Sequence, residues 1–161
     1  MNVEIRRINF SHPESGQVLV ELLDAYARDP MGGGHGLDPV VKSVLATRLA
    51  DVPGAVGLLA YVDGEAAGLA TAFAGFSTFA ARPLLNIHDL AVLPLFRGRG
   101  VGQALLAELE QIAHERGCCK LTLEVLSNNQ IAQGAYRKFG FAPYALDEAA
   151  GVAQFWQKWL G

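Results

Sequence analysis

Residues 97–102 read Arg-Gly-Arg-Gly-Val-Gly and lie between an apolar run at residues 84–92 and an amphipathic segment at residues 101–116. This order predicts a strand, a glycine-rich turn and a helix. The first amides of a helix lack intrahelical partners and lie at the positive end of the helix dipole, so they bind anions readily. Glycine lets a ligand approach the backbone, and the two guanidinium groups match phosphate oxygens. The turn is therefore predicted to bind a phosphate or pyrophosphate.

The turn differs from two common phosphate-binding motifs. Gly102 is followed by Gln103 and Ala104, so the lysine and hydroxyl residue of a P-loop are missing. The spacing of Gly98, Gly100 and Gly102 also differs from the G-x-G-x-x-G dinucleotide motif. The pattern instead resembles the Arg/Gln-x-x-Gly-x-Gly/Ala acyl-CoA signature of the GNAT superfamily of N-acetyltransferases.

A second motif carries the same resemblance. Residues 120–141 are similar to the family's strand, its Asn-x-x-Ala-x-x-x-Tyr-x-x-x-Gly-Phe helix and the exit turn. The matching positions are Asn129, Ala132, Tyr136, Gly140 and Phe141. The resemblance extends over residues 55–145 and is one of general layout before residue 50.

Hydrophobic periodicity and turn residues predict the remaining elements. Strands are expected at residues 3–8, 56–62, 66–76, 84–92, 120–125, 141–146 and 152–159. Helices are expected at residues 15–27, from Pro39 onward, at 101–116 and at 131–139, with an exposed, flexible loop at residues 29–39. The resemblance implies an α/β fold in one N-acetyltransferase domain over residues 1–161. Its central sheet would be mixed and mostly antiparallel, with splayed parallel strands and flanking helices.

Composition restricts the partners and the location of the chain. The net charge of −3 gives no basic surface for nucleic acid. No apolar run is long enough to cross a bilayer, and residues 1–7 lack a signal-peptide pattern, so we expect a cytoplasmic protein without a membrane partner. The adjacent Cys118 and Cys119 suit neither a structural disulfide nor a metal site.

Acetyl transfer to an amine requires a neutral amine, a polarised carbonyl and a proton donor for the departing thiolate. The resemblance places Tyr136 at the family's general-acid position, although a tyrosine there can also serve only in packing. His88 and Asp89 lie where many members carry an acidic base that acts directly or through water. Strand alternation predicts that they face opposite sides of the sheet, so that one of them reaches the substrate. His88 also fits a hydrogen-bonded structural histidine.

The resemblance implies acetyl-CoA as co-substrate, without a metal. The main chain of the strand before the turn would pair with the pantetheine arm, the turn would hold the phosphates, and an asparagine would contact the coenzyme. The implied coenzyme-binding residues are Leu90, Ala91, Val92, Arg97, Gly98, Arg99, Gly100, Val101, Gly102 and Asn129.

The loop at residues 29–39 contains His35 among glycines, but no second ligand lies at metal-binding spacing. In the family the segment between the first two helices often forms a wall of the acceptor site. We therefore expect His35, Phe76 and Phe79 to line a substrate site. The aromatic residues at 155, 156 and 159 indicate a closing strand or a contact between two copies, which makes a homodimer one expectation.

Two functions follow from these patterns. The first is an N-acetyltransferase that moves the acetyl group of acetyl-CoA to a primary amine of a small molecule, by direct attack in a ternary complex. The alternative is a non-catalytic acyl-CoA-binding sensor or scaffold. Tyr136 beside a complete coenzyme signature favours the enzyme.

Overall fold

The computed structural model describes all 161 residues, and the chain divides into two compact units, Met1–Leu123 and Glu124–Gly161. The single domain over residues 1–161 stays a prediction. In chain order the elements are β1 (Val3–Arg7), α1 (Pro13–Arg28), the 3-10 turn η1 (Pro30–Gly32), α2 (Pro39–Ala50), β2 (Val56–Val62), β3 (Glu65–Ser77), β4 (Arg82–Val92), the 3-10 turn η2 (Pro94–Phe96), α3 (Val101–Glu115), β5 (Leu121–Leu123) and α4 (Gln130–Phe139).

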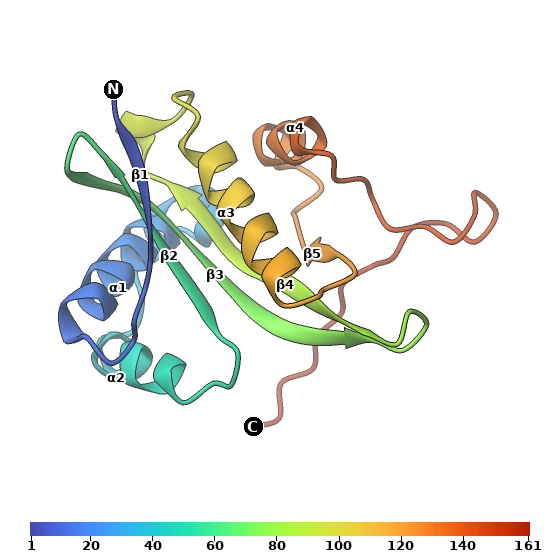
Figure 1. Cartoon of the computed structure of the whole chain (residues 1–161), viewed down its shortest axis with the longest axis horizontal. Helices are drawn as coiled ribbons and strands as arrows, with labels where there is room; N and C mark the ends of the chain where they lie inside the picture. The colour runs from blue at the N-terminus through green and yellow to red at the C-terminus, as the bar shows by residue number, and fades with distance from the viewer. The chain divides into compact units, whose positions relative to one another are not determined.

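One sheet in the first unit has the strand order β1-β2-β3-β4-β5 (Figure 1). The first three pairings are antiparallel, whereas β4 pairs with β5 in parallel. The parallel pairing joins only residues 85–87 to residues 121–123, although β4 continues to Val92. The predicted mixed, mostly antiparallel sheet with splayed parallel strands is therefore confirmed.

Helices cover both faces of this sheet. Figure 1 shows α1 and α2 on one face and α3 on the other. The first face contains a buried cluster from α1, α2, β2 and β3, formed by Leu19, Leu22, Leu49, Leu59 and Leu69. Because helices pack on both faces, the unpaired backbone of the sheet lies at its edges, which include the splayed part of β4.

The second unit contains α4, the helix predicted at residues 131–139. It begins at Asn129, whose side chain accepts a hydrogen bond from the Ala132 amide at 3.1 Å. It ends at Gly140, whose φ of 112° is a conformation that glycine adopts without strain. The helical prediction here is confirmed.

The strands predicted at residues 141–146 and 152–159 are wrong. The structure has only an isolated bridge between Ala145 and Val152 in this region. Large apolar side chains such as Trp156 and Trp159 are more than four-fifths exposed. Apolar alternation alone does not make a strand, because its backbone groups also need a neighbouring strand to bond.

A charge cluster joins the first strand to α3. Arg7 donates to Glu108 at 2.6 Å and to both carboxylate oxygens of Glu115 at 2.8 and 2.9 Å. The Arg7 hydrogen bonds to Glu115, followed by one from Gln111, lower the pKa of Glu115 to about 2. The cluster therefore connects an edge strand to a helix more than a hundred residues away in the sequence.

We expect Arg7→Gln to destabilise the protein at pH 7 and to have little effect near pH 2. The lowered pKa means that the charged pair stabilises the folded state above pH 4.5, the ordinary value for Glu115. This contribution is lost as the pH falls toward 2, where the carboxylate takes up a proton. Urea unfolding of both proteins at pH 7 and at pH 2.5 measures it. A difference in midpoint that is equal at both pH values would contradict the assignment.

Candidate active site

The outer edge of β4 is open beyond its short pairing with β5. The Leu93 amide donates to the Ala67 carbonyl of the β3 side at 2.8 Å. Since backbone direction alternates along a strand, Leu90 and Val92 direct their amide groups to the opposite, open edge. This edge offers hydrogen-bonding groups to an extended ligand.

The glycine-rich turn lies directly after this edge. Gly98 and Gly100 have φ values of 74° and 82°, and nothing lies within 4 Å of the position of an added Cβ at either residue. Gly100 precedes α3 without a side-chain cap, and the first helical hydrogen bond runs from Ala104 to its carbonyl. The amides of Val101 and Gly102 thus lie at an uncapped helix start with open space over the glycines. This cradle fits a pyrophosphate group.

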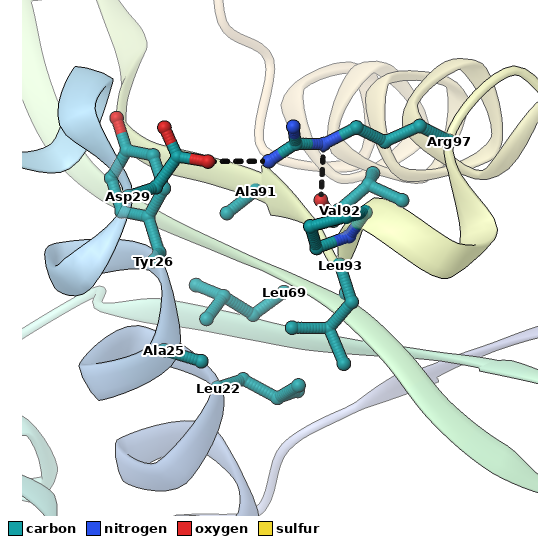
Figure 2. A pocket seen from close by; sticks show the side chains of 11 residues that line it. Leu22, Ala25, Tyr26, Asp29, Leu69, Ala91, Val92, Leu93 and Arg97 are labelled. Carbon is teal, nitrogen blue, oxygen red and sulfur yellow. Dashed lines mark hydrogen bonds and ion pairs between the residues drawn. The ribbon is translucent and has the colours of Figure 1, made fainter.

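The two arginines of the turn have different surroundings. The Arg97 guanidinium donates from Nε to the Val92 carbonyl and from Nη2 to Asp29, both at 3.0 Å (Figure 2). The Arg99 guanidinium lies 5.8 Å from the ring centre of Phe96. Arg97 therefore connects elements of the protein, whereas Arg99 is placed at the surface of the turn. Phosphate contacts by both residues stay predictions.

A β-bulge changes where His88 and Asp89 point. The register of the β3–β4 ladder shifts next to Thr71, which leaves His88 without a cross-strand partner. The His88 ring lies edge-on to Phe73 with ring centres 5.6 Å apart, and Asp89 accepts a hydrogen bond from the Thr71 hydroxyl. Thr71 and Phe73 lie two residues apart on the face that carries α1 and α2. The prediction of opposite faces is wrong, because the bulge interrupts the alternation.

A pocket of about 190 Å³ lies between α1 and the end of β4. Figure 2 shows Leu22 and Tyr26 of α1 facing Ala91 and Leu93 across it, with Asp29 and Arg97 at one side. Burial raises the pKa of Tyr26, and the charges of Asp89 and Asp29 raise it further. The phenol is therefore a protonated, hydrogen-bonding group in a mainly apolar pocket.

Tyr26 was not predicted from the sequence as a site residue. Its only signal was a place in the apolar stripe of α1, which is equally typical of a core residue. Phe73 of β3 was also missed, because an apolar residue in a strand is equally typical of the core. Its ring contacts His88.

The glycine-rich loop (residues 29–38) is fixed at its second end by Asp24 of α1. Asp24 accepts hydrogen bonds from the Leu37 amide at 2.8 Å and from Lys42 at 3.2 Å. The Leu37 amide, followed by Lys42 and Arg28, lowers the pKa of Asp24, so this carboxylate stays charged at neutral pH. His35 is exposed in the loop, and no group of three or more His, Cys, Asp or Glu side chains is arranged to hold a metal ion.

Phe76 and Phe79 lie far from the pocket along the β3–β4 ladder. Phe76 pairs with Pro83 near the hairpin tip, and Phe79 is 97% exposed in that tip. The pocket lies at the opposite end, where Gly68 pairs with Val92. The structure does not bring these two phenylalanines to the pocket.

Tyr136 and Asn129 belong to the second unit. The Tyr136 ring packs edge-on against Phe141 with ring centres 5.9 Å apart. Asn129 caps α4, which gives it a structural role besides the predicted coenzyme contact. The catalytic role of Tyr136 stays a prediction.

The sequence matches the acetyltransferase (GNAT) family over residues 17–141, and the chain belongs to this family. The matched range contains the glycine-rich turn and α4. No helix combines the length and the apolar character needed to cross a membrane.

Streptothricin acetyltransferase of Streptomyces lavendulae is 42% identical over 87 residues, which are 54% of this chain and 44% of that protein. The match thus spans less than half of the relative. An aminoglycoside acetyltransferase from an uncultured soil metagenomic sample, meta-AAC0020 in complex with sisomicin, has a TM-score of 0.75 at 18% identity, with 98% of this chain and 96% of that chain covered. AAC(6')-Iy in complex with the bisubstrate analogue CoA-S-monomethyl-acetylneamine has a TM-score of 0.74 at 22% identity, with 98% and 99% covered. The two solved structures share the fold.

We expect Asp24→Ala to free the second end of the glycine-rich loop. The substitution removes the acceptor of the Leu37 amide, so exchange of this amide should accelerate about tenfold, which corresponds to the loss of one hydrogen bond. Hydrogen exchange followed by mass spectrometry measures it. Glu21→Ala, on the same helix and away from the loop, is the matched control. Equal exchange in both variants would show that Asp24 does not hold the loop.

Proposed function

We propose that this protein transfers the acetyl group of acetyl-CoA to a primary amine of a small molecule, by direct attack in a ternary complex. The observation that carries the proposal is the open edge of β4, which leads into an uncapped, glycine-rich helix start. An extended thioester can lie along the β4 edge, with its pyrophosphate group at the helix start. Family membership supports the same reaction.

The coenzyme lies along β4 in this proposal. The main chain of Leu90, Ala91 and Val92 pairs with the pantetheine arm, and the amides at 98–102 hold the pyrophosphate. Arg99 adds a guanidinium to the phosphates, and Asn129 stays a predicted coenzyme contact. The bisubstrate complex of AAC(6')-Iy supports a CoA ligand for this fold.

Acetyl-CoA supplies an activated carbonyl, and side chains of the protein accept and donate the protons. The neutral amine forms the new C–N bond at the carbonyl while the C–S bond breaks. His88 or Asp89 takes the proton from the amine nitrogen, and Tyr136 gives its proton to the leaving thiolate. The bulge supports this assignment, because it presents both His88 and Asp89 on one face of the sheet.

The acceptor is a cationic small molecule with a primary amine. Asp89 and the Tyr26 phenol provide a charged and a hydrogen-bonding group for an ammonium. The glycine-rich loop lines the pocket at Asp29, so His35 would serve a part of the acceptor that extends beyond the pocket. The similarity to streptothricin acetyltransferase and to the aminoglycoside acetyltransferase in complex with sisomicin supports an amine-rich acceptor. Phe76 and Phe79 would serve only an acceptor that extends along β3 to the hairpin tip.

The test is release of free thiol from acetyl-CoA in the presence of a panel of amines, which includes streptothricin and sisomicin. Amine-dependent release, together with mass spectrometry of an acetylated product, is the expected result. Saturable acetyl-CoA binding without release from any amine would favour the acyl-CoA-binding sensor. No binding of acetyl-CoA would overturn the proposal.

We expect Gly100→Ala to lower acetyl-CoA affinity about tenfold. An alanine with φ near 82° is strained by roughly 1–2 kcal/mol, so the turn changes its conformation to relieve the strain. Gly64→Ala is the matched control, because Gly64 has a φ of 89° and equally open surroundings in the β2–β3 turn. Calorimetric titration measures both affinities. Equal affinities in the two variants would exclude the turn from the coenzyme site.

We expect Tyr136→Phe to reduce kcat about a hundredfold or more, the size of a typical general-acid contribution. The affinity for acetyl-CoA should stay nearly unchanged, because the phenol acts on the departing thiolate. Tyr144→Phe, in the same unit and 57% exposed, is the control. Unchanged turnover in Tyr136→Phe would remove this residue from the acid role.

A further inference from the structure

The Arg97–Asp29 ion pair joins the glycine-rich turn before α3 to the glycine-rich loop after α1. Arg97 Nη2 lies 3.0 Å from Asp29 Oδ2, across 68 positions of sequence. The same guanidinium holds the Val92 carbonyl, at the end of β4. One side chain therefore connects the coenzyme turn, the open strand edge and the segment that borders the pocket (Figure 2).

Asp29 uses its other groups to organise the loop. Its Oδ1 accepts the Met31 amide at 3.0 Å, and its carbonyl accepts the amides of Gly32 and Gly34 at 2.8 and 3.0 Å. An added Cβ at Gly32 would lie 2.0 Å from the Tyr26 carbonyl, so this turn packs tightly on the end of α1. The first part of the loop thus has a defined conformation that depends on Asp29.

The electrostatics keep this link charged. The Met31 amide, followed by Arg97, lowers the pKa of Asp29, so the carboxylate is ionised at neutral pH. Half of the Arg97 side chain is exposed, compared with 23% of Asp29. Because both side chains are partly exposed, the pair contributes little to the stability of the fold. It can therefore break or form when Arg97 changes position.

A coenzyme phosphate held by the turn amides and by Arg99 would leave this pair in place. The turn offers the amides of Val101 and Gly102 and the Arg99 guanidinium to an anion, whereas Arg97 already has two acceptors. Binding at the turn would restrict residues 97–102 and, with them, the Arg97 side chain. The restriction would then pass to Asp29 and the loop amides that it holds.

We propose that Asp29 is a positioning residue that makes the order of the glycine-rich loop depend on the coenzyme, through Arg97. The inference rests on the proposed function, because it needs coenzyme binding at the Arg97–Gly102 turn. Its consequence is that the loop beside the pocket becomes less mobile when the acetyl donor is bound. By linkage, an acceptor that requires the ordered loop binds more tightly to the coenzyme complex.

Hydrogen exchange of the loop with and without CoA tests the proposal on the full-length protein. In the natural sequence, saturating CoA should slow exchange of the amides at residues 31–34 about fivefold or more, the lower end of ordinary coupling between sites. Asp29→Asn keeps an oxygen for the Met31 amide but removes the charge that pairs with Arg97. In this variant CoA should still bind, while the slowing of exchange falls to less than about twofold.

Asp38→Asn is the matched control. Asp38 lies in the same loop and caps α2 through the Val40 amide, without touching Arg97, and asparagine is an equally good cap. This variant should retain the full effect of CoA on the loop.

Three outcomes overturn the inference. CoA that binds the natural protein without slowing loop exchange, or that accelerates it, contradicts the link but leaves the proposed function intact. If CoA slows loop exchange in Asp29→Asn as much as in the natural protein, the coupling does not run through Asp29. Absence of CoA binding by calorimetry contradicts both the proposed function and the inference.

Discussion

The short parallel pairing of β4 with β5 is the constraint on which the candidate site depends. Parallel strands need a crossover, and α3 supplies it between them. Because β5 pairs with only residues 85–87, the rest of β4 keeps one edge of its backbone unpaired by a strand. The start of α3 follows that edge, so an extended hydrogen-bonding surface and an uncapped helix start lie next to each other. Pairing β5 further along β4 would remove the open edge.

The bulge in β4 adds side chains to this backbone site. One extra residue at His88 turns both His88 and Asp89 to the face that carries α1, where Tyr26 borders the pocket. Thr71 and Phe73 of the neighbouring strand then hold the two side chains by a hydrogen bond and a ring contact. The strand itself thus places His88 and Asp89 on that face, without a loop.

Local signals in the sequence predicted most of the first unit. Glycines with left-handed φ values at 98 and 100, the turn residues between the strands at 56–62 and 66–76, and the apolar stripe of α1 each act over a few residues. The bulge at His88 and the Arg97–Asp29 pair depend on contacts distant in sequence, so periodicity could not reveal them. For residues 141–159 the alternation was misleading, because nothing in a single segment states which strand will pair with it.

NMR titration of nitrogen-15-labelled protein with acetyl-CoA tests the central claim most directly, since it reports on each backbone amide. We expect saturable shifts of the amides of Gly98, Gly100, Val101 and Gly102, with Leu90 and Val92 along the open edge of β4. Saturable binding that leaves these amides unchanged and shifts another surface would contradict it, as would the absence of binding.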